Sequence, residues 1–247
     1  MFTHNIDPVL FNLFGLEIRY YGVVFLVGFI IAYFFLNFLA KERKLKIKKD
    51  DVLDLLVYIA VGAVIGARIL HVLEEFSFYI SNPSEIIAIW HGGLSFYGAA
   101  VGAALTGLLF CKKKKIKFYD IADMLVIPLA LGLAMGRISN FINAELYGKI
   151  TDLNWCVNFP NAEGCRHPSQ IYESFKNLAI FFVLFFSRNK KLPKGALFWS
   201  FITLYSFLRF FMEFFREQTA LFLGLSVSQF LAILAFITGL FFLIKKK

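Results

Sequence analysis

The chain has 247 residues, of which 59% are hydrophobic and 18% aromatic. Soluble domains contain roughly 45–50% apolar residues, so this composition excludes an ordinary water-soluble fold. The net charge of +9 does not indicate a nucleic-acid-binding protein, because the basic residues form short clusters at the ends of apolar runs. We therefore expect a single transmembrane domain over residues 1–247 that binds no nucleic acid.

Seven apolar runs are long enough to cross a bilayer as helices, which takes about 20 residues each. In chain order they lie near residues 21–40, 52–72, 94–110, 121–138, 171–186, 196–215 and 225–244. They predict an all-α polytopic membrane protein with about seven transmembrane helices. No cationic segment precedes the first apolar stretch, so we expect no cleaved signal peptide.

Lysine and arginine clusters follow the first, third and fifth runs and end the chain, as KERKLKIKK, KKKKIK, RNKKLPK and KKK. The positive-inside rule makes these connections cytoplasmic and places the N-terminus outside. The longest opposite connection, about residues 143–169, is then an extracytoplasmic loop region that contains Cys156 and Cys165. Disulfides persist on that side, and a bond between these two cysteines is as plausible as two free thiols.

Three pairs of glycines have the small-xxx-small spacing that lets membrane helices approach closely. They are Gly62 and Gly66, Gly98 and Gly102, and Gly132 and Gly136. We expect all three to serve helix packing.

Arginines also occur in or beside the spans, at Arg68, Arg137 and Arg209. A charge inside a membrane helix costs about 2.5–3.5 kcal/mol on insertion scales, so each needs a reason to be there. For a lone arginine, a structural ion pair and a functional role have about equal weight.

Polar residues accompany two of these arginines. The fourth span ends in GRISNFINAELYG, where Arg137 comes together with Asn140, Asn143 and Glu145. Asparagine capping of the helix would need one asparagine and leaves the charged residues unexplained. The sixth span carries a stripe at helical spacing, made of Tyr205, Arg209, Glu213 and Arg216.

Three further motifs lie at the same outer level of the spans. RYYG contains Tyr21, GGLSFYG contains Tyr97, and RHPSQIYE contains His167 and Gln170. Two arginines with amides, phenols and carboxylates suit a phosphate carried by a lipid, because guanidinium groups hold phosphate oxygens in pairs. We expect an anionic, lipid-borne ligand. HExxH is absent and the histidines are dispersed, so we expect neither a metal nor another cofactor.

These motifs resemble those of the bacterial prolipoprotein diacylglyceryl transferases, in the same order and over nearly the whole chain. GRISNFINAELYG is similar to the signature of that family. The resemblance implies an enzyme that transfers the diacylglyceryl group of phosphatidylglycerol to the thiol of the lipobox cysteine in signal-peptide-bearing preprolipoproteins. A thioether forms and glycerol phosphate leaves, as the first step of lipoprotein maturation in the bacterial cytoplasmic (inner) membrane.

The resemblance also implies roles for residues. The expected catalytic residues are Arg137, Arg209, Tyr97, Glu145 and Tyr21. The expected substrate-binding residues are Arg137, Asn140, Asn143, Gly148, Tyr205, Glu213, Arg216, His167 and Gln170. Tyr97 departs from the family, since many members have His there, so the general base stays open among Tyr97, His91, His167 and Glu145.

Two other functions fit a polytopic protein. A multispan transporter of an anionic or lipid-borne substrate should show internal repeats and polar residues at mid-membrane depth. A metal-dependent phospholipid synthase should show an acidic cluster. The sequence shows neither pattern, which favours the transferase.

Overall fold

The computed structural model describes residues 2–160, 162–217 and 221–245. The chain forms two compact units. The first comprises Met1–Phe35 and Ala122–Lys247, and the second comprises Leu36–Ile121. Two helices, α1 (Tyr20–Glu42) and α5 (Phe118–Ile142), run from one unit into the other.

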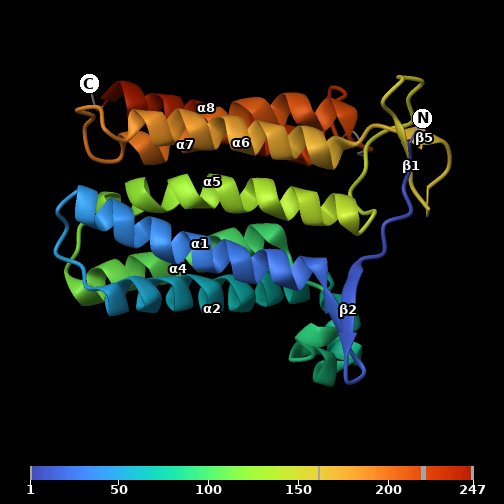
Figure 1. The fold of residues 1–247 in the computed structure, drawn as a ribbon, viewed down its shortest axis with the longest axis horizontal. Coiled ribbons are helices and arrows are strands. Elements are labelled where there is room, and N and C mark those ends of the chain that lie inside the picture. The colour runs from blue at the N-terminus through green and yellow to red at the C-terminus, as the bar shows by residue number, and fades with distance from the viewer. Residues whose placement is uncertain (1, 161, 218–220, 246–247) are drawn as a thin grey trace. The chain divides into compact units, whose positions relative to one another are not determined.

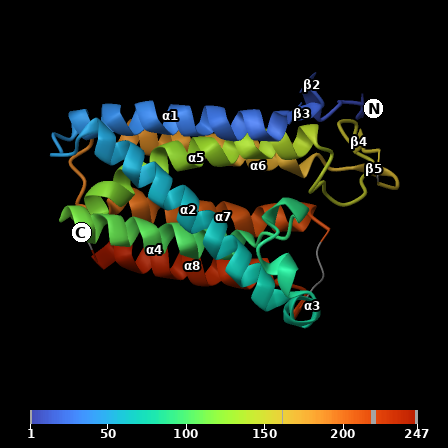
Figure 2. The same cartoon turned by 90° about the horizontal axis from the view of Figure 1, so that it is seen from below.

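The second unit is built on two long helices that lie side by side (Figures 1 and 2). Its elements are α2 (Lys49–Glu74), α3 (Phe76–Ser81), the 3-10 turns η1 (Pro83–Ile86) and η2 (Ile89–His91), and α4 (Phe96–Lys114).

Glycines allow α2 and α4 to approach closely, because a Cβ atom on Gly66 or Gly102 would overlap the carbonyl oxygen of Gly98 or Gly62. The packing role predicted for these two glycine pairs is confirmed. The predicted packing role is wrong for Gly132 and Gly136, because a Cβ atom on either glycine would meet nothing within 4 Å in the described part of the chain.

The first unit combines membrane helices with a small sheet. Besides parts of α1 and α5, it contains β1 (Phe2–Thr3), β2 (Val9–Leu13), β3 (Leu16–Arg19), β4 (Val157–Asn158), β5 (Cys165–Arg166), α6 (Ser169–Ser187), α7 (Ala196–Met212), η3 (Glu213–Phe215) and α8 (Val227–Lys245). Strand β4 pairs with β1 in parallel and with β5 in antiparallel orientation, while β2 and β3 form a hairpin. Helix α7 packs against both α6 and α8.

A disulfide joins Cys156, the residue before β4, to Cys165, the first residue of β5. The sequence left this bond open, and the structure contains it. The bond fixes the segment between α5 and α6, whose two ends carry site residues.

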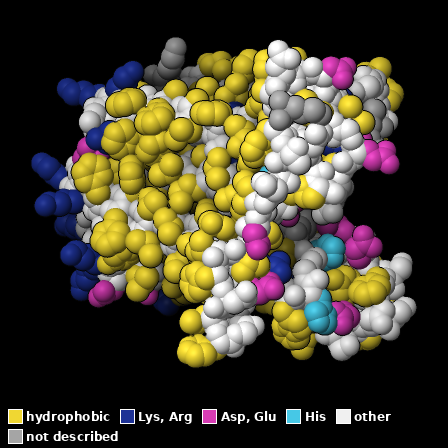
Figure 3. Space-filling model, turned by 45° about the vertical axis from the view of Figure 1, so that its right-hand side comes forward, with side chains coloured by type: hydrophobic (Ala, Val, Ile, Leu, Met, Phe, Trp, Pro, Cys, Tyr) yellow, Lys and Arg dark blue, Asp and Glu magenta, His cyan; other side chains and the backbone are white. Residues whose placement is uncertain are grey.

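Within the described residues, five helices are long and apolar enough to cross a membrane: α1, α2, α5, residues Ala196–Phe215 and α8. Hydrophobic side chains cover the visible outer faces of the helices (Figure 3). The expected helical, multi-pass membrane protein is therefore confirmed. Two predicted spans are not among the five, because α4 ends in three lysines and α6 carries Gln170, Glu173 and Lys176 in its first turns.

Candidate active site

Charged side chains from three helical segments of the first unit meet at Glu173 of α6, whose side chain is 2% exposed. Lys176 Nζ lies 2.8 Å from Glu173 Oε2, and Arg209 Nη1 donates to Glu173 Oε1 at 2.5 Å. Arg137 Nε lies 3.7 Å from Oε2, and Arg216 Nη1 lies 3.8 Å from Oε1. We refer to these five residues as the Glu173 cluster.

A second buried carboxylate adjoins the cluster. Arg209 Nη2 lies 2.7 Å from Glu213 Oε2, and the Ser226 hydroxyl donates to Glu213 Oε1 at 3.1 Å. The four cations of the cluster therefore face two carboxylates, a surplus of two positive charges. Such a surplus in a poorly solvated site favours binding of an anion.

The three arginines remain open to a ligand. The side chains of Arg137, Arg209 and Arg216 are 20%, 15% and 13% exposed, whereas Lys176 is 3% exposed. Lys176 also lies 4.2 Å from the centre of the Tyr205 ring, a cation–π contact. Lys176 is therefore an internal partner of Glu173, whereas the three arginines supply the hydrogen-bond donors that a ligand can reach.

The residues of the GRISNFINAELYG motif form a chain of hydrogen bonds beside the cluster. Arg137 Nη1 donates to Asn140 Oδ1 at 3.4 Å, and Asn140 Nδ2 donates to Glu145 Oε1 at 2.7 Å. Gln170 Nε2 donates to the backbone oxygen of Glu145 at 2.7 Å, which ties α6 to this motif. Tyr21, at the start of α1, interacts electrostatically with Glu145 and Arg137. The structure thus brings together Arg137, Asn140, Glu145 and Gln170.

Gly148 lies where three backbone segments meet. Its N–H donates to the His167 oxygen at 2.9 Å, and the next N–H, of Lys149, donates to the Phe215 oxygen at 2.9 Å. A Cβ atom on Gly148 would lie 2.8 Å from His167 Cβ and would overlap the Phe215 oxygen. Arg216 follows Phe215 and is the β-bridge partner of Gly148. The small size of Gly148 therefore helps to set the position of Arg216.

His167 packs within aromatic rings and does not contact the charged cluster. Its ring meets Tyr172 and Phe215 edge-on, and burial lowers the pKa of its imidazole below the ordinary value. His167 is thus neutral at neutral pH and holds the segment before α6 in place. The buried Oδ1 of Asn143 has no hydrogen-bond partner among the described residues.

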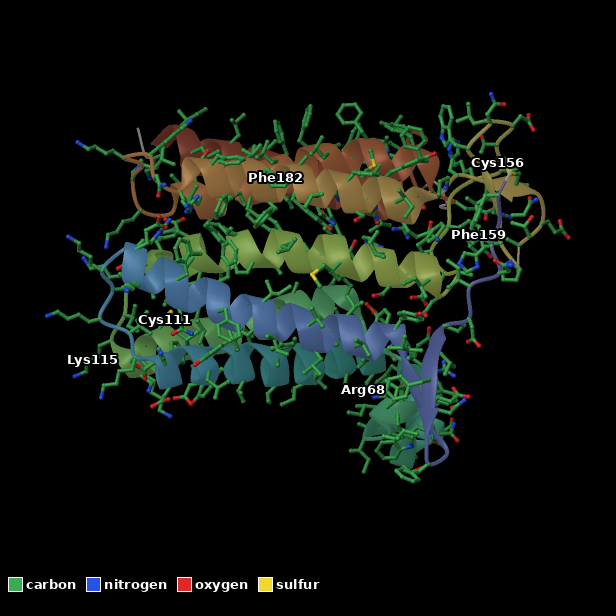
Figure 4. The ribbon with its side chains drawn as sticks, in the orientation of Figure 1. Arg68, Cys111, Lys115, Cys156, Phe159 and Phe182 are labelled. Carbon is green, nitrogen blue, oxygen red and sulfur yellow. A yellow bond between two sulfur atoms is a disulfide. The ribbon has the colours of Figure 1, made fainter. Side chains whose placement is uncertain are left out.

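Two residues singled out from the sequence belong to the second unit. Tyr97 lies in the first turn of α4 and is 45% exposed. Arg68 is buried, and its guanidinium donates to the backbone oxygens of Ile86 at 3.0 Å and Gly92 at 2.6 Å (Figure 4). Further acceptors are the carbonyls of Glu85, Ala88 and Gly93. Arg68 therefore holds the loop between α3 and α4, which is a structural role.

Glu173 and Lys176 were not predicted as site residues. Their signal lies in α6, where Gln170, Glu173, Lys176 and Asn177 fall on one buried face of an otherwise apolar helix. Buried ionisable residues at helical spacing in a membrane helix indicate partners on neighbouring helices. Among the described residues, no three His, Cys, Asp or Glu side chains gather as metal ligands would.

Comparisons with known proteins identify a family and its relatives. A family model described as prolipoprotein diacylglyceryl transferase matches residues 8–245. The chain is 41% identical to the phosphatidylglycerol–prolipoprotein diacylglyceryl transferase of Geobacter sulfurreducens, over 96% of this chain and 94% of the relative. The enzymes of the same name from Rickettsia canadensis and Campylobacter hominis are 37% and 34% identical, over 88% and 95% of this chain and 86% and 89% of the relatives.

Proposed function

The chain belongs to the prolipoprotein diacylglyceryl transferase family, and on that premise we propose that the Glu173 cluster holds the phosphate of phosphatidylglycerol during transfer. The enzyme transfers the diacylglyceryl group of phosphatidylglycerol to a prolipoprotein, the first step of lipoprotein maturation. One observation carries the proposal: four cations face two carboxylates, and three of the cations are partly exposed arginines.

The reaction adds negative charge to the phosphate. The sulfur of the lipobox cysteine attacks the glyceryl carbon that bears the phosphate oxygen, so a C–S bond forms as the C–O bond breaks. The electron pair stays on the oxygen, and a singly charged phosphodiester becomes a glycerol phosphate with a charge of about −2. A site with two surplus positive charges stabilises the departing phosphate more than the bound lipid, which accelerates the reaction.

The thiol must lose its proton before or during attack. An ordinary cysteine has a pKa of about 8.5, and a neighbouring positive charge raises its thiolate fraction. In our proposal Arg137 and Arg209 supply this field and bind the phosphate with Arg216, Asn140 and Tyr205. Glu145 in the first unit and Tyr97 in the second are the candidates for a residue that accepts the proton. Tyr21 contributes its hydroxyl to the same region.

Transfer by purified protein tests this function. We expect a diacylglyceryl thioether on a lipobox peptide when phosphatidylglycerol is supplied, in equal amount with and without EDTA. Loss of product in EDTA would contradict a metal-independent site. No product under any lipid condition would contradict the proposed transferase function itself.

We also propose that α4 and α6 complete a set of seven spans in the bacterial inner membrane, with the N-terminus outside. The lysine and arginine clusters support this orientation. Asn5 and Lys46 flank α1 and are both exposed. In intact cells, Asn5→Cys should react with a membrane-impermeant thiol reagent and Lys46→Cys should not, and the reverse pattern would invert the topology.

A further inference from the structure

A disulfide cross-links the segment between α5 and α6, which carries Gly148 near one end and His167 near the other. Its two cysteines differ in access, since Cys156 is buried and Cys165 is partly exposed. We propose that this bond is a site of reversible thiol–disulfide exchange and that its oxidation state sets the rate of transfer, an inference that rests on the proposed function.

The bond holds a very small sheet. Strands β4 and β5 contain two residues each and pair in two places, one of them opposite Cys165, while β1 extends the sheet by another two residues. Strand pairs of this size are marginally stable in water by themselves. A cross-link between residues nine positions apart reduces the chain entropy gained when such a pair opens. We therefore expect the β4–β5 pairing to depend on the disulfide.

Strand β5 is also bound to the beginning of the same segment. The Thr151 N–H donates to the Cys165 oxygen at 2.9 Å. The His167 N–H donates to the Lys149 oxygen at 3.0 Å, and the His167 oxygen accepts from the Gly148 N–H at 2.9 Å. The backbone of residues 148–151 is thus tied to β5, so a shift of β5 should displace this stretch as well.

The contacts continue from β5 to the Glu173 cluster. Arg166 follows Cys165 and is 8% exposed, and its Nη1 donates to the Gly148 oxygen at 3.3 Å. Gly148 forms a β-bridge with Arg216, whose Nη1 lies 3.8 Å from Glu173 Oε1. A contiguous series of contacts therefore joins the disulfide to the cluster. Opening the bond should displace Arg216, one of the three arginines assigned to the phosphate, and slow transfer.

The exchange needs a redox partner, and the chemistry identifies its class as a thiol–disulfide oxidoreductase. In the proposed topology residues 143–168 lie outside the membrane, where disulfides form and persist. A thiolate of this chain attacks the partner's disulfide, and the second thiolate then displaces the partner from the mixed disulfide. Two thiols of this chain become a disulfide while the partner's disulfide becomes two thiols, so electrons and protons balance. Cys165 forms the mixed disulfide because it is the partly exposed cysteine.

Reduction and re-oxidation of the purified protein test the dependence on the bond. Dithiothreitol should open it in the folded protein, so that the thiols alkylated after denaturation rise from one to three. We expect kcat/KM for phosphatidylglycerol to fall by about tenfold, less than the roughly 100-fold that a 1 Å displacement of a positioning group can cost, because the hydrogen bonds of Arg166 remain. Oxidised glutathione should restore the parent rate. Both reagents are removed before each assay, since the peptide substrate also carries a thiol.

Variants separate the bond from other effects of the reagents. Cys156→Ser/Cys165→Ser should have the rate of the reduced parent and should not respond to dithiothreitol. Cys111→Ser is the matched control, because Cys111 is buried outside the disulfide, and it should respond as the parent does. With oxidised glutathione, Cys156→Ser should form a mixed disulfide at Cys165 at least about tenfold faster than Cys165→Ser forms one at Cys156, because exposure favours reaction.

The outcomes separate the two proposals. An unchanged rate in the reduced parent, unfolding in the reductant, or a bond that dithiothreitol does not open would overturn the redox dependence and leave the transferase function standing. So would a rate that stays low after the bond has closed again. A mixed disulfide that forms faster at Cys156 would overturn the assignment of Cys165. An oxidised parent that transfers no diacylglyceryl group would refute the proposed function instead.

Discussion

Glu173→Gln removes the carboxylate on which four cations converge. In the parent, the nearest contacts of Glu173 are 2.5 Å to Arg209 and 2.8 Å to Lys176, in surroundings that leave its side chain 2% exposed. After the substitution, Glu213 alone faces the four cations, and the surplus rises from two charges to three. Breaking a buried ion pair costs about 3–5 kcal/mol, and the partial exposure of the arginines puts our expectation at the lower end, about 3 kcal/mol.

For a chain of this size, 3 kcal/mol lowers the midpoint of thermal unfolding by roughly 6–12 °C. Activity should be affected more strongly than stability, because Arg137, Arg209 and Arg216 lose the carboxylate that holds all three in position. A displacement of about 1 Å in a positioning group can cost about 100-fold in rate, so we expect kcat to drop by that factor. KM for phosphatidylglycerol should not rise, since the site becomes more positive. The test measures kcat, KM and the unfolding midpoint of each variant in the same detergent.

Glu217→Gln is the matched control. Glu217 also pairs with an arginine, Arg166, at 2.6 Å, but its side chain is 67% exposed, and exposed pairs contribute about 0–1 kcal/mol. The double variant Glu173→Gln/Lys176→Met returns the surplus to two charges and should be more stable than Glu173→Gln alone. The reasoning is refuted if Glu173→Gln keeps the parent's stability and turnover, or if the double variant regains nothing.

Four further substitutions test single residues. Arg137→Lys and Arg209→Lys should each lose most transfer activity without unfolding, because an ammonium lacks the planar fork that grips two phosphate oxygens, and near-normal turnover in either would make that arginine structural. Tyr97→Phe should lose about tenfold, the effect of one hydrogen bond, whereas a drop of several hundredfold with loss of the basic limb of the pH profile would identify Tyr97 as the base. Gly148→Ala should destabilise by about 1–3 kcal/mol through overpacking against the Phe215 oxygen, and an unchanged unfolding midpoint would contradict that close approach.

The contacts that the sequence predicted are mostly local. Asn140 and Glu145 lie within one motif with Arg137, and Arg209 and Glu213 are one helical turn apart, so helical geometry brings each group together. The central role of Glu173 depends on which face of α6 turns toward α5 and α7. Spacing along one helix shows that a face is polar, but it does not identify the partners across the interface.

Residue spacing also failed to identify interaction partners for two other features of the sequence. Gly132 and Gly136 have the spacing of the α2 and α4 glycines, yet a Cβ there would meet nothing within 4 Å in the described part. The pattern shows that another helix can approach, not that one does. Arg68 could not be assigned from sequence because its partners are backbone oxygens of a loop, and the path of a loop follows from turn conformations that residue types only bias.

The ion pair between Glu173 and Lys176 has a consequence for how the chain is assembled in the membrane. These two residues are three positions apart on α6, so they can neutralise each other as soon as that helix forms, before any neighbour is in place. Arg137 is synthesised earlier and Arg209 and Arg216 later, so Glu173 has fewer partners until α7 has entered the bilayer. We expect the Glu173 carboxylate, already in the membrane, to favour insertion of α7, so that Arg209 helps its own helix to integrate during biosynthesis.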